Sequence, residues 1–221
     1  TFYRPLEYRE PKAGGRLMPV LRALKPDGIL MREPVELEQI VRMGVPIVCS
    51  PYTREYIPGV VSVVTDHAAV GETAARHLLD RGLRHFAYCG FDDWWWSRLR
   101  RDVFCETVHR AGFAADAYRL PRAKAERTWA RELPRIGQWL TGLPKPVGVM
   151  ACNDDRGELV IEACKAVGLE VPDQVAVIGV DDDSLVCDLC SPPLSSVATS
   201  LRKTSYEAAA VLDRLIQGKQ T

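Results

Sequence analysis

The sequence predicts an α/β protein built on parallel sheets, because short apolar runs alternate with longer segments of helical periodicity. The clearest example is the stretch from Val147 to Asp183. It has an apolar strand over Val147–Ala151, a helix over Glu158–Val167 closed by Gly168, and a second strand over Val175–Gly179. Both strands end in polar residues. Parallel strands deliver such residues to one edge of a sheet, where ligands bind in open α/β folds.

The other elements follow the same alternation in chain order. Helices are expected over residues 12–24, 35–43, 67–81, 98–111, 128–140 and 201–216. Strands are expected over residues 2–6, 28–31, 45–49, 60–65, 85–89 and 194–198, with a loop over 50–59 and a strand or irregular segment over 113–120. Asp66 is expected to cap the helix that follows it, and Pro134 to mark a helix start or a kink.

The composition excludes several classes of protein. The 221 residues include 29 basic and 29 acidic side chains, so the chain lacks the basic surface of a nucleic-acid-binding domain. No apolar run reaches the roughly 18 residues of a membrane span, and no signal peptide opens the chain. The 7 cysteines are an odd, scattered set, which favours reduced, mostly buried thiols in a cytoplasm over a disulfide framework.

An ordered set of segments carries a family resemblance. The segments are VVTDHAAVGETAARHLLDRGLRHFAYCG (Val63–Gly90), SRLRRDVF (Ser97–Phe104), MACNDDRGELV, VPDQVAVIGVDDD and SPPLSSVATSLRKTSYEAAAVLDRLI. Together they resemble the effector-binding domain of lactose-repressor-type transcription regulators, which has the periplasmic-binding-protein-like fold. Within that group the chain is similar to the sugar-sensing domain of xylose-operon regulators, which is fused to an AraC-type DNA-binding domain. The resemblance covers Val45–Gly218.

This resemblance implies two doubly wound parallel-sheet lobes with a ligand cleft between them. Residues 1–64 and 199–221 would form an incomplete N-terminal lobe, and residues 65–198 the C-terminal lobe. The first strand and helix of the N-terminal lobe would precede Thr1, and a DNA-binding domain would lie outside this chain. A homodimer is also implied.

The resemblance further implies which residues contact the ligand. Arg100 falls where family members carry an arginine that bonds sugar hydroxyls. Asn153 and Asp181 fall at the positions where family members bind the sugar from the tips of strands. Trp129 falls near the position where family members carry an aromatic residue that stacks on the sugar. Val103 replaces a glycine that is usual in the family, so helix packing is expected to differ there.

The chemistry of these side chains suits a neutral sugar. A carboxylate accepts hydrogen bonds from adjacent hydroxyls, an amide both donates and accepts, and a guanidinium donates in a fixed fork. An alternative for Asp181 is a solvated acid or a helix cap. Asp154 is first interpreted as a helix N-cap and second as a ligand, whereas Asp182 and Asp183 are expected to cap a helix or face water.

Three adjacent tryptophans, Trp94–Trp96, cannot all face the same side of a helix or strand. One interpretation is that one or two of them pack in the core while another covers the surface. The other is that Trp95 or Trp96 lines the ligand site, since aromatic residues are common in such sites. The sequence leaves both open.

No motif points to catalysis, a metal or a cofactor. Cys187 and Cys190 form one CxxC pair, which offers only two metal ligands, and the 4 histidines are isolated. The aspartate clusters could suggest a magnesium site, but no phosphate-binding Gly-Lys-Ser/Thr loop is present. We therefore expect no catalytic residue, no metal and no cofactor.

The sequence thus predicts a cytoplasmic, non-enzymatic sensor of D-xylose or a related monosaccharide. It would act on DNA only through a domain absent from this chain, with no membrane contact. One alternative is a periplasmic sugar-binding protein that feeds a transporter, which the cysteines disfavour. Another is an enzyme acting on a sugar, for which no nucleophile–base pair can be identified.

Overall fold

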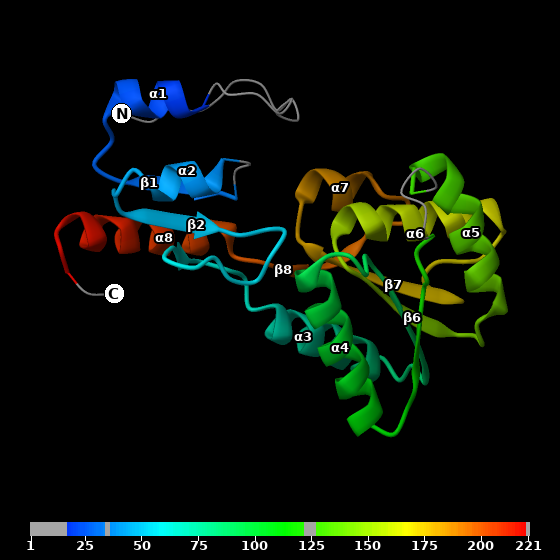
Figure 1. Cartoon of the computed structure of the whole chain (residues 1–221). Coiled ribbons are helices and arrows are strands. Elements are labelled where there is room, and N and C mark those ends of the chain that lie inside the picture. Colours follow the sequence, from blue (N-terminus) through cyan, green and yellow to red (C-terminus); the bar gives the residue numbers. More distant parts are fainter. Residues whose placement is uncertain (1–16, 34–35, 122–126, 220–221) are drawn as a thin grey trace. The chain divides into compact units, whose positions relative to one another are not determined.

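The computed structural model describes residues 17–33, 36–121 and 127–219, which form two compact units (Figure 1). The first unit contains the described residues up to Val64 together with those from Leu201 onward, and the second contains Thr65–Ser200. The described strands pair only in parallel, which confirms the predicted α/β class with parallel sheets. The predicted strand over residues 2–6 lies outside the described residues.

The first unit has a three-stranded sheet in the order β1-β2-β3. Its strands are β1 (Ile29–Arg32), β2 (Ile47–Ser50) and β3 (Val61–Ser62), and its helices are α1 (Leu17–Leu24), α2 (Leu37–Val41) and α8 (Leu201–Ile216). The sheet packs with α1 and α2 around a core that includes Ile29, Ile40 and Ile47. Helix α8 contacts β1 and β2. The strand expected over residues 60–65 is shorter than predicted, because the chain leaves the sheet after Ser62.

The second unit has a five-stranded sheet in the order β5-β4-β6-β7-β8. The strands are β4 (His85–Cys89), β5 (Ala115–Ala117), β6 (Val147–Ala151), β7 (Val175–Asp181) and β8 (Ser195–Ala198). The helices are α3 (His67–Asp80), α4 (Trp95–Arg110), α5 (Trp129–Gly142), α6 (Asp154–Ala166) and α7 (Ser184–Leu189). Strand β6 is buried at every position, as expected for a central strand covered on both faces.

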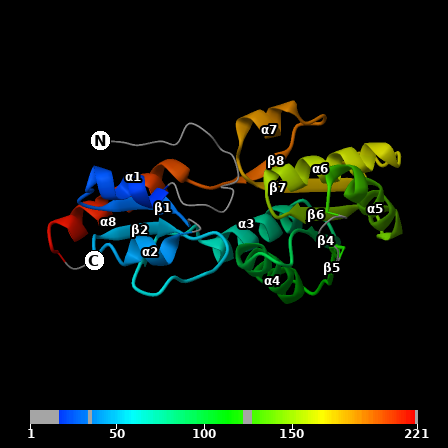
Figure 2. The same cartoon turned by 45° about the horizontal axis from the view of Figure 1, so that its top comes forward.

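Helices cover both faces of this sheet: α3 and α4 lie on one, and α5 and α6 on the other (Figure 2). Successive strand residues therefore enter different cores. On β4, Phe86 and Tyr88 pack toward α3 and α4, whereas Ala87 and Cys89 pack toward α5 and α6. This two-sided cover leaves the strand ends as the places where polar side chains can gather.

Two of the helices begin earlier than the sequence predicted. Helix α4 begins at Trp95 rather than at residue 98, and α6 begins at Asp154 rather than at residue 158. Asn153 caps α6, because its side chain accepts a hydrogen bond from the Arg156 amide at 3.1 Å. The cap predicted at Asp66 is confirmed. Pro134 lies inside α5, so a helix start near it was wrong.

Helices α3 and α4 approach each other closely at Gly71. A Cβ atom on Gly71 would lie 2.5 Å from the Arg100 carbonyl oxygen and 3.1 Å from the Phe104 amide nitrogen. The same Cβ would lie 3.3 Å from Cβ of Val103, the residue that stands where the resembling family has glycine. The small residue at this crossing is therefore on α3, and it allows the part of α4 that carries Arg100 to lie close against α3.

The Gly71→Ala substitution should lower the free energy of unfolding by about 1–3 kcal/mol, because the added methyl group would force α3 and α4 apart. Urea denaturation measures the change. Gly142→Ala is the matched control, since no atom lies within 4 Å of its Cβ position. Equal losses from the two variants would contradict the packing argument.

Candidate functional site

Polar side chains gather at the carboxyl ends of β6 and β7. Asn153 follows β6, Asp181 ends β7, and α4 brings Arg100 to the same edge of the sheet. The Arg100 Nη2 nitrogen lies 3.7 Å from Oδ1 of Asp181. The structure therefore brings together the arginine and the aspartate that the sequence analysis singled out.

The Arg100 side chain is only 4% exposed, and several neighbouring groups contact its guanidinium. Its Nε–H donates to Nδ1 of His67 at 3.3 Å, and its Nη1 donates to the backbone carbonyl of Cys152. The guanidinium lies over the Trp96 ring, 5.0 Å from the ring centroid. These contacts fix the orientation of the guanidinium and leave Nη2 on the side of Asp181.

Asp181 has a backbone conformation that non-glycine residues seldom adopt. Its φ is 112°, in the left-handed region, and such strain often accompanies function. The side chain is 44% exposed. Burial raises the pKa of this carboxyl and nearby Arg100 opposes the increase, while Asp154 and Asp155 raise the pKa further. These surroundings disfavour the charged form of Asp181, so hydrogen-bond donors from a ligand would stabilise the carboxylate.

The alternative of Asp181 as a helix cap is wrong, because α7 is capped by Asp183, whose carboxylate accepts from the Leu185 amide at 3.0 Å. The expectation that Asp182 and Asp183 cap a helix or face water is confirmed, since Asp182 is exposed. Asp181 therefore has no local backbone role that would explain a carboxylate at this position.

The Asn153 amide is partly engaged in capping. Its oxygen accepts from the Arg156 amide, and its Nδ2 lies 3.5 Å from Oδ2 of Asp155. Because the contact with Asp155 is long, the N–H groups of the Asn153 amide are less engaged than its oxygen. Asn153 can thus donate to a ligand while it continues to cap α6.

Asp154 does not cap α6, so the first interpretation of this residue was wrong. Its side chain is 3% exposed. Oδ1 accepts from the Ser196 hydroxyl at 2.6 Å, and Oδ2 accepts from the Asp183 amide at 2.8 Å. Burial raises the pKa of the carboxyl, and these bonds oppose the increase. Both oxygens already have partners within the unit, so we no longer expect a direct ligand contact here.

The tryptophans at the start of α4 pack largely inward. Trp95 and Trp96 are buried, and Trp94 is partly buried. Trp95 meets His67 edge-on at a centroid distance of 5.0 Å, and Trp96 underlies Arg100. Trp96 thus supports the arginine. Trp129, the first residue of α5, is 45% exposed, and α5 covers the sheet face opposite to that of α4, which carries Arg100.

Sequence reasoning missed the residues that support this edge. His67 receives the Arg100 hydrogen bond, and its only sequence signal is a position just after the Asp66 cap. A buried ion pair joins Arg156 of α6 to Glu132 of α5, with Nη2 and Oε2 2.6 Å apart. The Arg156 guanidinium also lies over the Phe91 ring at 4.8 Å. No local pattern pairs these residues.

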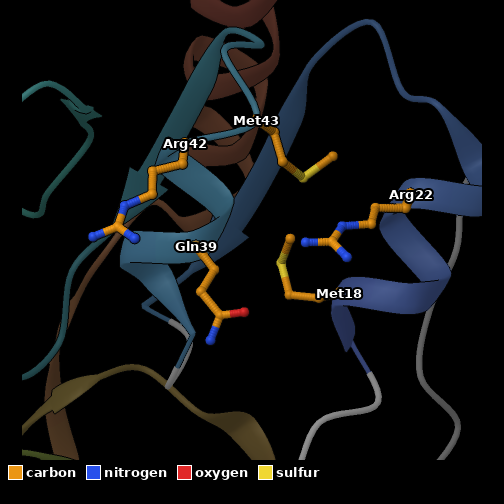
Figure 3. Close-up of a pocket in the computed structure, with 5 residues that line it drawn as sticks. All are labelled: Met18, Arg22, Gln39, Arg42 and Met43. Carbon is orange, nitrogen blue, oxygen red and sulfur yellow. The ribbon is translucent and has the colours of Figure 1, made fainter.

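A separate pocket lies in the first unit and has a volume of about 470 Å³. It is lined by Met18 and Arg22 of α1, by Gln39 of α2, and by Arg42 and Met43 just after α2. Figure 3 shows Arg22 extending toward the two methionines, while Arg42 points away from them. None of the predicted ligand residues lines it.

All seven cysteines have free thiols, as predicted, and all except the partly buried Cys105 are buried. Burial and then the nearby Asp154 carboxylate raise the pKa of the Cys187 thiol to about 12. Within the described ranges, no group of three or more His, Cys, Asp or Glu side chains is arranged to hold a metal ion. Among the same residues, no helix is both long and apolar enough to cross a membrane.

The fold and the family comparison agree on the class of protein. Residues 75–221 match the family model of the periplasmic binding protein-like domain, and the chain belongs to that family. The resemblance to effector-binding domains of the lactose-repressor type, predicted from sequence motifs, is thereby confirmed, since the similar proteins are regulators of this kind.

The relatives include xylose operon regulators. That of Haemophilus influenzae is 29% identical over 208 residues, which cover 90% of this chain and 54% of the relative. That of Escherichia coli K12 is 30% identical over 202 residues, which cover 88% of this chain and 51% of the relative. The chain therefore spans about half the length of these curated relatives.

Solved structures of transcription regulators are also similar to this chain. A xylose-binding transcription activator matches with a TM-score of 0.74 and 26% identity, over 92% of this chain and 59% of that one. The CelR regulator in complex with cellobiose matches with a TM-score of 0.71 and 25% identity, over 92% of this chain and 63% of that one.

The pH dependence of stability should report the His67–Arg100 contact. Burial and then Arg100 lower the pKa of His67 from 6.5 to about 4. Between pH 6.5 and pH 4, His67 is protonated in the unfolded chain but stays neutral in the folded domain. The free energy of unfolding therefore decreases as the pH falls from 6.5 toward 4.

His67→Asn offers an amide oxygen to Arg100 and cannot titrate, so it should remove a pH-dependent loss on the order of 2 kcal/mol. Urea denaturation at a series of pH values gives the difference between the two proteins. The exposed His109, replaced in the same way, is the control. If wild type and His67→Asn lost stability in parallel, His67 would not be the titrating group.

Proposed function

We propose that this domain binds a neutral sugar, D-xylose or a related monosaccharide, as the effector of a transcription regulator. The observation that carries the proposal is the buried, fixed Arg100 beside the half-exposed, strained Asp181 at one sheet edge. A guanidinium donates and a carboxylate accepts, so the pair complements adjacent hydroxyls. Asn153, at the neighbouring strand tip, adds an amide that can donate.

The proposed ligand set is Arg100, Asn153 and Asp181, with Trp129 and Trp96 as the aromatic contributors. Trp129 is exposed enough to lie against the apolar face of a sugar ring. Trp96 is buried, so in this proposal it acts chiefly beneath Arg100. The choice of xylose rests on the names of the xylose regulators and of the xylose-binding activator.

The wider proposal follows from those relatives. A sugar bound at this edge would change the arrangement of the two units, and an attached DNA-binding domain would respond to that change. Such a regulator works in the cytoplasm and has no catalytic step. A ligand shifts a conformational equilibrium only by its differential affinity for the two states, so the effector must bind one arrangement better.

Thermal unfolding against pentoses and hexoses tests the sugar. A ligand at 100 times its Kd adds about 2.7 kcal/mol to the stability. For a domain of this size, that is a shift in Tm of roughly 5–10 °C. We expect the shift with D-xylose. A shift with another sugar alone would retain the sensor and change its ligand, whereas the absence of a shift with any sugar would overturn the proposal.

The Asp181→Asn variant should weaken sugar binding by about 10- to 100-fold in isothermal titration calorimetry, because it removes the charged acceptor. Asparagine tolerates the left-handed conformation, and the raised pKa of Asp181 means that its charge opposes folding near neutral pH. The Tm should therefore not fall. Asp173→Asn, in the exposed turn before β7, is the control, and equal affinity in both variants would refute the site.

The oligomeric state of the proposed regulator has one structural indication. Leu185 and Leu189 lie one turn apart on α7, and both are exposed. We propose that this face lies in the interface of a homodimer. Leu189→Glu should then shift sedimentation toward the monomer, because an unpaired carboxylate is costly to bury in an apolar interface. Sugar affinity should stay within about twofold, because Leu189 is not one of the proposed ligand residues. A monomeric wild-type protein would contradict the dimer.

A further inference from the structure

Asp154 joins three segments of the second unit, and this inference rests on the proposed sugar site beside it. Asp154 is the first residue of α6, and its carboxylate accepts hydrogen bonds from the Asp183 amide after β7 and from the Ser196 hydroxyl of β8. Ser196 in turn accepts from the Asp182 amide at 3.0 Å. The two amides that follow Asp181 are therefore both held by one carboxylate–hydroxyl pair.

The backbone at the end of β7 needs such support. Asp181 and Asp182 have φ values of 112° and 57°, two consecutive non-glycine residues in the left-handed region. Each such residue costs on the order of 1 kcal/mol and persists only where surrounding contacts fix it. The hydrogen bonds to the amides of Asp182 and Asp183 are the contacts in the structure that do so.

The sequence of β7 also makes room for the buried carboxylate. Gly179 pairs with Ser196 in the sheet register, and a Cβ atom on Gly179 would overlap Oδ1 of Asp154. Any other residue at this position would displace the side chain that holds the turn. Glycine, carboxylate and hydroxyl thus form one steric and hydrogen-bonded unit.

Strand β8 extends the effect of this unit along the chain. Asp181 pairs with Ala198, the last residue of β8, and the chain then continues through Ser200 into α8 of the first unit. We infer that Asp154 and Ser196 are positioning residues, which hold Asp181 in its ligand-binding orientation and transmit its displacement to β8, where the chain leaves the second unit. Asp154 acts through Asp181 and does not contact the sugar.

The chemistry of Asp154→Asn tests this assignment with little change in volume. A carboxylate accepts from both the Ser196 hydroxyl and the Asp183 amide, whereas a carboxamide has one accepting oxygen and one donating NH2 group. The carboxamide can keep both neighbours only by accepting from the Asp183 amide and donating to the Ser196 oxygen, so the negative charge and the hydrogen bond from Ser196 to residue 154 are lost. Ser196→Ala removes the hydroxyl from the other side of the same pair.

Isothermal titration with D-xylose should show about a 10-fold or greater increase in Kd for Asp154→Asn and for Ser196→Ala, because Asp181 would then adopt its ligand-binding orientation only part of the time, and the apparent Kd rises as that fraction falls. The double variant should bind little more weakly than either single variant, because the pair acts as a unit. Asp173→Asn is again the control. Unchanged Kd values with a lowered Tm would show a merely structural role and overturn the inference.

Amide hydrogen exchange separates this inference from the proposed function. Without any sugar, Asp154→Asn should accelerate exchange at Asp182 and Asp183 by about 10-fold or more, since their hydrogen bonds weaken. Unchanged exchange would overturn the positioning role, even if no sugar in the panel bound to wild type and the proposed function failed on its own.

The link to β8 has its own measurement. In wild type, sugar binding should slow exchange across residues 196–200, and in Ser196→Ala at saturating sugar this slowing should be lost. Equal slowing in both proteins would show that Asp181 and β8 are not connected through Ser196. Gly179→Ala, which displaces the Asp154 carboxylate without replacing any hydrogen-bonding side chain, should reproduce the Asp154→Asn result, and wild-type behaviour of this variant would contradict the inference.

Discussion

A buried guanidinium must have its charge and its N–H groups satisfied, and the edge of the second sheet is arranged around that requirement at Arg100. The close crossing of α3 and α4 at Gly71 brings the arginine to the strand ends. A neutral histidine, a backbone carbonyl and an indole face then occupy three sides of the guanidinium. The Asp181 carboxylate lies on the fourth side, 3.7 Å from Nη2 of Arg100. At this distance the carboxylate is weakly held by the arginine and can accept hydrogen bonds from other donors.

The proposed site combines side chains that are fixed by contacts within the protein with polar groups that remain available to a ligand. The Arg100 and Asp154 side chains are buried and hydrogen-bonded, whereas Asp181 is half-exposed and its pKa is raised. Protein sites of this kind keep their donors rigid and leave a few polar atoms unsatisfied for the ligand. The free capacity lies on Arg100 Nη2, the Asp181 carboxylate and the Asn153 amide, which match the mixed donors and acceptors of a polyol.

The alternation of apolar runs was enough to predict the parallel sheets, and the polar residues that follow β6 and β7 were enough to predict the edge of the second sheet at which polar side chains gather. Local signals also located the cap at Asp66, because a cap and its helix are adjacent in sequence. The supporting contacts could not be found this way. Asp154 meets a hydroxyl 42 residues away, and the Arg100–His67 contact spans 33 residues. Such pairs exist only once the sheet order is known.

The interruption of the first unit by the second has a consequence for biosynthesis. Gly28, just before β1, packs against Leu212 and Ile216, so α8 is part of a structure whose strands were made much earlier. On the ribosome, the whole of Thr65–Ser200 emerges before this helix does. The second unit can fold as a contiguous segment, while β1 and β2 wait with one side exposed to water. A chaperone that protects the nascent chain should therefore engage these strands rather than the second unit.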